Sequence, residues 1–146
     1  MNFARVAAAA VVAWVVSLPV GFLVNDVLLA GLYAPNAAAM RPEAEMMATL
    51  PLGFVFLLIG FFAFAYAYAR GYEGGNGVME GLRFGLLVAV IVTGFGMIWH
   101  YVLYPITGSL AAAMIIDSIL GLALYGAIVG AIYKPAGSPV RKAATV

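Results

Sequence analysis

The chain alternates between long runs of apolar residues and short connections rich in proline, glycine and charge. The apolar runs cover residues 6–24, with an extension towards residue 33, and residues 50–69, 84–104 and 110–133. A helix of about 20 apolar residues crosses the roughly 30 Å hydrocarbon layer of a membrane. Strands are excluded because the runs do not alternate and an open sheet edge is not tolerated in lipid. The pattern predicts an all-α transmembrane four-helix bundle in one domain, residues 1–134.

Positively charged residues fall mostly on one side of these predicted spans. If the helices alternate in direction, that side carries Arg5, Arg70, Arg83, Lys134, Arg141 and Lys142. Only Arg41 falls on the other side. Lys and Arg are retained on the cytoplasmic side of membrane helices. We therefore expect the N- and C-termini to be cytoplasmic, with residues 135–146 as a short basic cytoplasmic tail.

Composition agrees with a lipid-embedded chain and argues against several other classes of protein. The 146 residues are 66% hydrophobic and 9% charged, which is more apolar surface than a soluble core of this size can bury. A net charge of +1 and the lack of a basic patch argue against nucleic-acid binding. Without cysteine, the chain has no disulfide and no thiolate metal site. No motif implies a metal, a cofactor or a set of catalytic residues.

The few polar residues near or within the predicted spans are the candidate functional residues. Counting along the helices places Asp26, His100 and Asp117 at a similar depth, in the outer third of the bundle. Ionisable groups in lipid cost about 3 kcal/mol or more, so they commonly mark functional sites. We expect these three side chains to line a pocket that opens to the outside. The nearby members of this pocket are Asn25, Tyr101 and Tyr104.

A structural interpretation of the same residues stays open. Asp117 can pair with His100 and lock two helices together, and Asp26 can cap a helix end at the membrane surface. A single histidine beside one carboxylate is often such a satisfied pair. On the structural interpretation, Asp117→Asn lowers stability alone, whereas loss of a ligand from a folded variant indicates a pocket.

Small residues predict where helices pack closely. Gly126 and Gly130 form a stripe on the last helix, on the face opposite Asp117 and Gly121, and Gly96 belongs to a small-residue face of the third helix. Glycines four residues apart let helix backbones approach each other. We expect one face of the last helix to pack within the bundle and the other to meet a partner chain or lipid.

The glycine-rich connection before the third span has a structural interpretation. Residues 73–85 contain many glycines, but match neither the dinucleotide-binding fingerprint nor a phosphate-binding loop. Glu80 suits the positive N-terminus of a helix, and Arg83 can reach the lipid headgroups. We therefore expect a tight cytoplasmic turn here.

Four short segments, spread over nearly the whole chain, together form a pattern: residues 1–5, 25–26, 80–85 and 126–135. This pattern resembles small bacterial four-helix inner-membrane proteins grouped under domains of unknown function. The resemblance implies a multi-pass location in the bacterial inner membrane. It implies no activity.

Three functions are compatible with these features. The first is a non-catalytic subunit or interaction protein of a membrane complex, in contact with the lipid bilayer and with a membrane-protein partner or further copies of itself. The second is a small oligomeric transporter or ligand-binding membrane protein that uses the outer Asp/His pocket. The third is an enzyme that modifies a lipid or isoprenoid, with His100 as general base and Asp117 orienting it. Short loops and the lack of a catalytic motif favour the first.

Overall fold

Helices make up nearly all of the chain that the structure describes. The computed structural model describes residues 1–133, so the predicted basic tail, residues 135–146, lies outside the described residues. Four helical segments of 26 to 29 residues are long and apolar enough to cross a membrane: Phe3–Leu28, Glu43–Gly71, Gly77–Leu103 and Gly108–Tyr133. The prediction of an all-α bundle with four long apolar helices is confirmed, and the chain is compatible with an integral membrane protein. The side on which each terminus lies stays a prediction.

Two of the four spans change their helical winding near one end. The first span and the connection after it consist of α1 (Phe3–Phe22), the π-helix η1 (Leu23–Leu28), α2 (Ala30–Tyr33) and the 3-10 helix η2 (Ala34–Ala39). The third span consists of α4 (Gly77–Val92), the π-helix η3 (Thr93–Met97) and α5 (Ile98–Leu103). The second and fourth spans are the uninterrupted helices α3 (Glu43–Gly71) and α6 (Gly108–Tyr133).

The helices begin before the apolar runs because polar residues cap them. The side chain of Asn2 accepts a hydrogen bond from the Arg5 N–H, and that of Asn76 accepts one from the Val78 N–H at the start of α4. Such caps satisfy backbone donors that a helix leaves unpaired in its first turn. The second span likewise begins at Glu43 instead of residue 50, with its acidic first turn at the positive end of the helix dipole.

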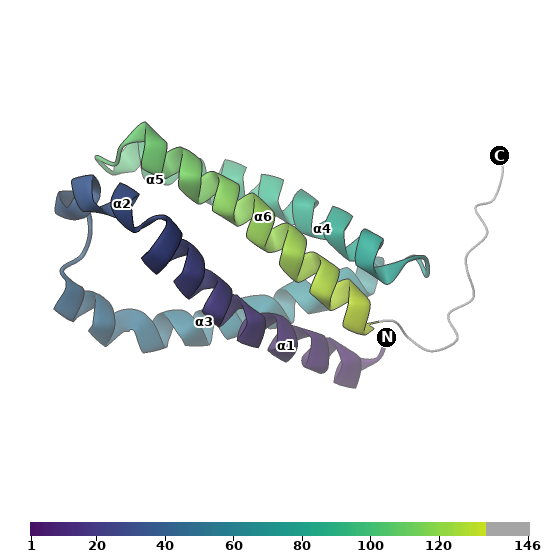
Figure 1. Ribbon diagram of the computed structural model, residues 1–146. Helices are drawn as coiled ribbons and strands as arrows, with labels where there is room; N and C mark the ends of the chain where they lie inside the picture. The colour runs from purple at the N-terminus through teal and green to yellow at the C-terminus, as the bar shows by residue number, and fades with distance from the viewer. Residues whose placement is uncertain (134–146) are drawn as a thin grey trace.

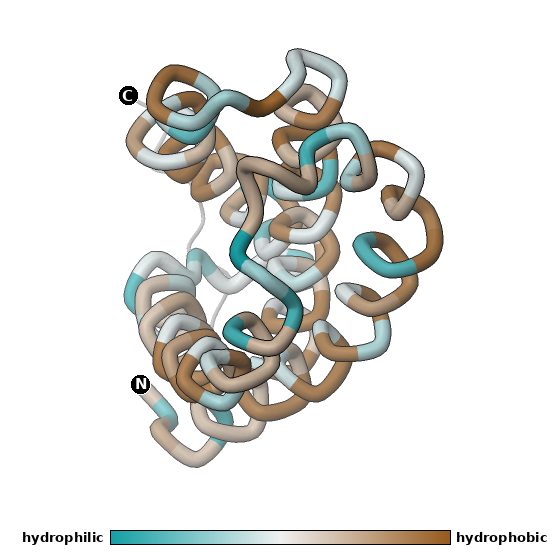
Figure 2. Tube along the Cα trace, turned by 90° about the vertical axis from the view of Figure 1, so that its left-hand side faces the viewer, coloured by the Kyte–Doolittle hydropathy of each residue, from teal (hydrophilic) through white to brown (hydrophobic). Residues whose placement is uncertain are grey.

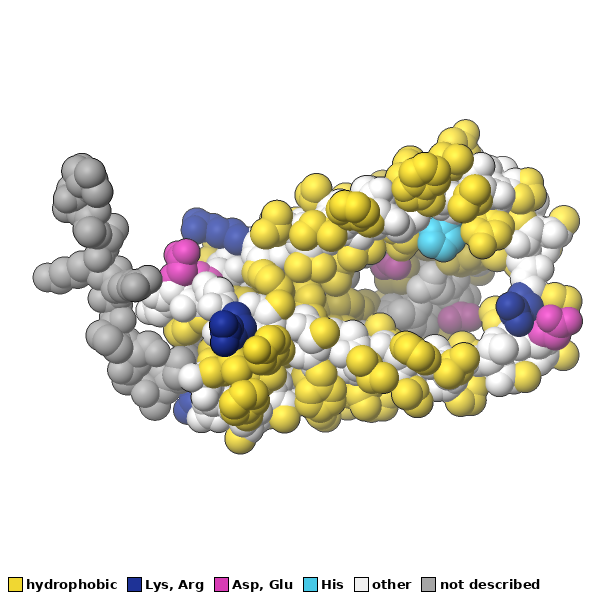
Figure 3. All heavy atoms as spheres, turned by 180° about the vertical axis from the view of Figure 1, so that it is seen from behind, with side chains coloured by type: hydrophobic (Ala, Val, Ile, Leu, Met, Phe, Trp, Pro, Cys, Tyr) yellow, Lys and Arg dark blue, Asp and Glu magenta, His cyan; other side chains and the backbone are white. Residues whose placement is uncertain are grey.

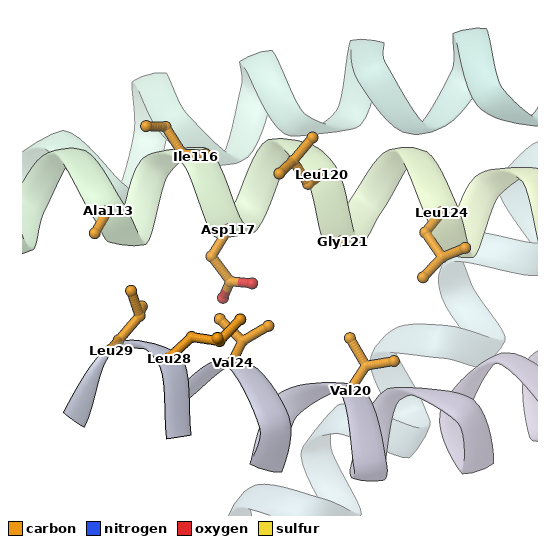
Figure 4. A pocket seen from close by; sticks show the side chains of 10 residues that line it. All are labelled: Val20, Val24, Leu28, Leu29, Ala113, Ile116, Asp117, Leu120, Gly121 and Leu124. Carbon is orange, nitrogen blue, oxygen red and sulfur yellow. The ribbon is translucent and has the colours of Figure 1, made fainter. Parts of the chain in front are cut away.

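The tightest helix pair is α4 with α6. A Cβ atom on Gly81 would overlap the carbonyl oxygen of Gly126, one on Gly126 would overlap that of Gly81, and one on Gly130 would overlap that of Gly77. The glycine stripe of α6 therefore packs on α4 inside the chain. The face that carries Asp117 turns towards α1 instead (Figure 4).

Two other glycines that were expected at helix contacts lie elsewhere. A Cβ atom on Gly96 would meet nothing within 4 Å, and one on Gly121 would meet only the Tyr125 ring of the same helix. Neither residue marks a close approach of two backbones among residues 1–133.

The helices form two layers (Figure 1). The pair α4 and α6 makes one layer, and α1 and α3 make the other, with α1 packed on both α3 and α6. Small residues of α1, namely Ala9, Ala10 and Ala13, are fully buried and bring the layers together. They pack in one cluster with Phe61, Ala65 and Tyr68 of α3 and with Val129 and Tyr133 of α6.

Aromatic side chains close the bundle at the end where α1 begins and α6 ends; we call this the closed end. The Tyr68 ring packs against the rings of Tyr72, Phe84 and Tyr133, with centroids 5.7 to 6.0 Å apart. The Tyr68 hydroxyl also donates a hydrogen bond of 3.1 Å to the carbonyl oxygen of Gly77. One buried tyrosine thus connects α3, α4 and α6.

The opposite end, which carries α2, η2 and α5, is the open end. Before Phe61, nearly every residue of α3 is exposed, and the space-filling view shows a hollow between the two layers with acidic side chains inside it (Figure 3). Asn36, only 2% exposed, holds the connections together at this end. Its side chain donates to the Leu32 carbonyl oxygen (2.7 Å) and accepts from the Thr107 N–H (2.7 Å). The open end is therefore fixed by hydrogen bonds and by buried residues such as Leu110, and it lies outside the main buried cluster.

Hydrophobic residues predominate along the helices, and many of the hydrophilic residues lie in the connections (Figure 2). The exposed large side chains are predominantly those of Val, Leu, Ile, Phe and Met. A helix that is apolar all round is suited to lipid and not to water.

Candidate ligand-binding cavity

A cavity of about 380 Å³ lies between the first and last spans, near the open end. Its walls come from α1, η1 and the following Leu29 on one side and from α6 on the other (Figure 4). The lining residues are Val20, Val24, Leu28, Leu29, Ala113, Ile116, Asp117, Leu120, Gly121 and Leu124. All of them except Asp117 are apolar, so the cavity is hydrophobic and contains one carboxyl group.

The Asp117 carboxyl group projects from α6 across the cavity, towards Val24 and Leu28 (Figure 4). Asp117 lies nine residues after Gly108, which is about 14 Å along the helix axis. Within residues 1–133, its carboxyl group makes no hydrogen bond and no salt bridge. An unpaired carboxylate at this depth costs several kcal/mol, about 3 kcal/mol on insertion scales. Protonation of Asp117 or a bound cation would remove this cost.

The polar residues Asn25 and Tyr33 lie beside the cavity and bond to each other. The Tyr33 hydroxyl donates a hydrogen bond of 2.7 Å to the Asn25 side chain, whose amide nitrogen donates to the Gly21 carbonyl oxygen. Burial, with the negative charges of Asp117 and Asp26, raises the pKa of the Tyr33 hydroxyl. Tyr33 thus lies within electrostatic reach of both carboxyl groups and keeps its proton.

Tyr33 is a member of this polar group that the sequence analysis did not single out. The extension of the first apolar run towards residue 33 is the signal that could have found it, because it continues the chain past Leu28 into the short helix α2, which carries Tyr33. Asp26 itself is exposed on η1 and does not line the cavity.

The three candidate residues on α5 and at its C-terminal end lie outside the cavity lining. The His100 Nδ1 atom is 3.1 Å from the Gly96 carbonyl oxygen, and its ring lies 5.8 Å from that of Tyr104. His100, Tyr101 and Tyr104 are all exposed. The structure therefore does not join His100 to Asp117 by a hydrogen bond, and it does not bring the six candidate residues around one cavity.

The turn before α4 is held by its own side chains. The Glu80 carboxylate accepts hydrogen bonds from the backbone N–H groups of Glu73 and Gly75, and Asn76 caps the helix. Arg83 is exposed on the first turns of α4. Several backbone donors of the turn are therefore already used within it, as the predicted structural role would require.

The chemistry of the cavity favours binding. Among the described residues, no group of three or more His, Asp or Glu side chains is placed to hold a metal ion. The cavity wall offers one carboxyl group and no second polar side chain to act with it. No protein-family model, curated protein or solved structure matches this chain.

Proposed function

We propose that this protein is a non-catalytic, membrane-embedded binding protein that holds a small amphipathic molecule in the cavity between α1 and α6. The observation that carries this proposal is the carboxyl group of Asp117, which has no partner among residues 1–133, in an otherwise apolar cavity. Small-molecule sites have volumes of about 300 to 1,000 Å³, are mostly apolar and contain few polar groups. The volume of 380 Å³ lies at the small end of this range, which favours a compact molecule over an entire two-chain lipid.

We place the open end outside the cell and the closed end in the cytoplasm. Arg5, Arg70 and Arg83 belong to the closed end, and Arg41 to the connection at the open end; the space-filling view has the same distribution (Figure 3). Lys and Arg favour the cytoplasmic side. Together with the resemblance to small bacterial membrane proteins, this distribution supports a location in the bacterial inner membrane.

A phenylalanine that fills the cavity tests the binding function. We expect Ala113→Phe to lower the amount of co-purifying small molecule at least tenfold, because the aromatic ring occupies the space of the ligand. Native mass spectrometry of protein extracted gently from its own membranes measures the bound mass. Ala112→Phe is the matched control, since Ala112 is an exposed neighbour that does not line the cavity. Equal occupancy in both variants would contradict the proposal.

A role as a subunit of a membrane complex, or as a homo-oligomer, is the second candidate. It is favoured by the first half of α3, where residues 43–60 are nearly all exposed and receive little packing from the other spans. A partner chain in the membrane can cover this half. Crosslinking in native membranes from a cysteine at Val55, an exposed position of α3, should then give a defined larger species. Recovery of monomer alone would exclude this candidate.

A further inference from the structure

We infer that the molecule held in the cavity is a hydrophobic cation, and that its binding releases a proton from Asp117. This inference rests on the binding function proposed above and names the ligand class and the regulation of the same site. It follows from the charges around the cavity, from the composition of its wall and from the unpaired state of Asp117.

The charges around the cavity are negative. Asp117 projects into it from α6, and Asp26 lies on η1 between the lining residues Val24 and Leu28. The other titratable groups within electrostatic reach of Asp117 are the hydroxyls of Tyr33 on α2 and Tyr125 on α6, and both are neutral when protonated. No described Lys or Arg lines the cavity. An anionic ligand would find no cationic partner in this lining, whereas a cation would find a carboxyl group that can ionise and pair with it.

His100 is a further titratable group at the open end. It lies outside the cavity lining and is bonded to the backbone of its own helix. A protonated His100 would lower the cation affinity by long-range repulsion, and protonation of Asp117 would lower the same affinity. A test of pH dependence therefore has to separate these two residues.

The cavity wall defines the rest of the ligand. Apart from Asp117, side chains such as Val20, Ile116 and Leu124 offer no hydrogen-bond partner, so the body of the ligand is apolar. Its single positive charge belongs at the side that faces Asp117. A compact organic cation meets both requirements, and an inorganic cation does not, because the wall provides too few oxygen ligands to replace its water.

The proton balance follows from the low dielectric constant of the site. In the empty cavity the Asp117 carboxyl group keeps its proton, because no cation is present to stabilise the carboxylate. A bound cation supplies that stabilisation, so the carboxylic acid and the cation give a carboxylate–cation pair and one free proton. Cation and proton therefore compete for one carboxyl group.

Two probes of the same shape and opposite charge test this inference with the full-length protein in neutral detergent micelles. We expect saturable binding of tetraphenylphosphonium and none of tetraphenylborate. Asp117→Asn should weaken tetraphenylphosphonium binding at least tenfold, and Asp26→Asn, outside the cavity lining, should weaken it less.

Over the pH range in which Asp117 is protonated, cation affinity should rise about tenfold per pH unit, with one proton released per cation. Asp117→Asn should abolish this pH dependence, and His100→Gln should preserve it.

The outcomes separate the ligand class from the binding function. Binding of tetraphenylborate, or binding of both probes without any effect of Asp117→Asn, overturns the cation inference. If Ala113→Phe still abolishes that binding while Ala112→Phe does not, the cavity remains a binding site and the proposed function stands. If Ala113→Phe changes the binding of neither probe, the inference and the proposed function both fail. Cation binding without proton release overturns the inferred exchange of a proton for a cation at Asp117.

Discussion

Gly81→Ala should lower the free energy of unfolding by about 3 kcal/mol, the upper part of the range for overpacked interiors. The added methyl group would overlap the carbonyl oxygen of Gly126. This atom belongs to the backbone, so it can yield only if α4 and α6 move apart. In lipid, helix association depends on close packing and not on a hydrophobic driving force, so separation of the helices is costly.

The matched control is Gly60→Ala on α3. A Cβ atom at Gly60 would meet nothing within 4 Å, and alanine favours a helix over glycine by about 1 kcal/mol. Gly60→Ala should therefore be neutral or stabilising. Unfolding by a denaturing detergent in mixed micelles, followed by circular dichroism, measures both variants. Equal stability of the two would mean that α4 and α6 do not touch at Gly81.

Tyr68→Ala should be the most destabilising truncation at the closed end, with a loss of about 4 kcal/mol, as for large aromatic residues in packed cores. Tyr68 is 3% exposed and packs against three aromatic rings from three segments of the chain. Its removal leaves a cavity where α3, α4 and α6 meet. The same detergent titration measures this loss.

Two further variants divide the role of Tyr68 into its ring and its hydroxyl. Tyr68→Phe keeps the ring and removes the hydrogen bond to Gly77, at a cost of about 1 kcal/mol. Tyr66→Ala removes a tyrosine that is 44% exposed on the same helix, and should change stability by about 0.5 kcal/mol or less. A larger loss for Tyr66→Ala than for Tyr68→Ala would place the core of the bundle elsewhere.

The fold class could be predicted because the apolar runs are longer than any small soluble core requires. The run lengths alone define four spans. The bounds were less accurate, since the helices extend into polar caps such as Asn76 and into the acidic start of α3, where hydropathy gives no signal. A hydrogen-bonding cap can lie several residues beyond the apolar run that it serves.

The surroundings of the candidate residues could not be predicted from regular helical spacing. That spacing places Gly85, Ala89, Gly96 and His100 on one face, but the π-helix η3 lies between Ala89 and His100. One extra residue in a helical turn rotates everything after it by about 100°. His100 is accordingly exposed on α5, and Gly96 packs on no neighbouring helix.

The sequence identified Asp117 as a candidate, because an ionisable side chain in lipid is energetically costly. It did not identify the residues that surround Asp117. They come from α1 and η1, nearly 90 residues earlier in the chain, and only tertiary packing brings them to α6. The sequence analysis did not single out Gly81 and Gly85, yet the backbone of α6 lies directly against both.

We expect the bundle to span the membrane with its open end, which carries the Asp117 cavity, facing outward. Labelling of single cysteines with a membrane-impermeant maleimide tests it most directly, because the natural chain contains no cysteine that would react. Ala38→Cys lies exposed at the open end, and Glu73→Cys lies exposed in the turn at the closed end, with α3 between them. On intact cells, Ala38→Cys should be labelled, and Glu73→Cys should be labelled only after the membrane is permeabilised. The reverse labelling pattern would mean that the open end faces the cytoplasm. Labelling of both cysteines from outside would mean that α3 does not cross the membrane.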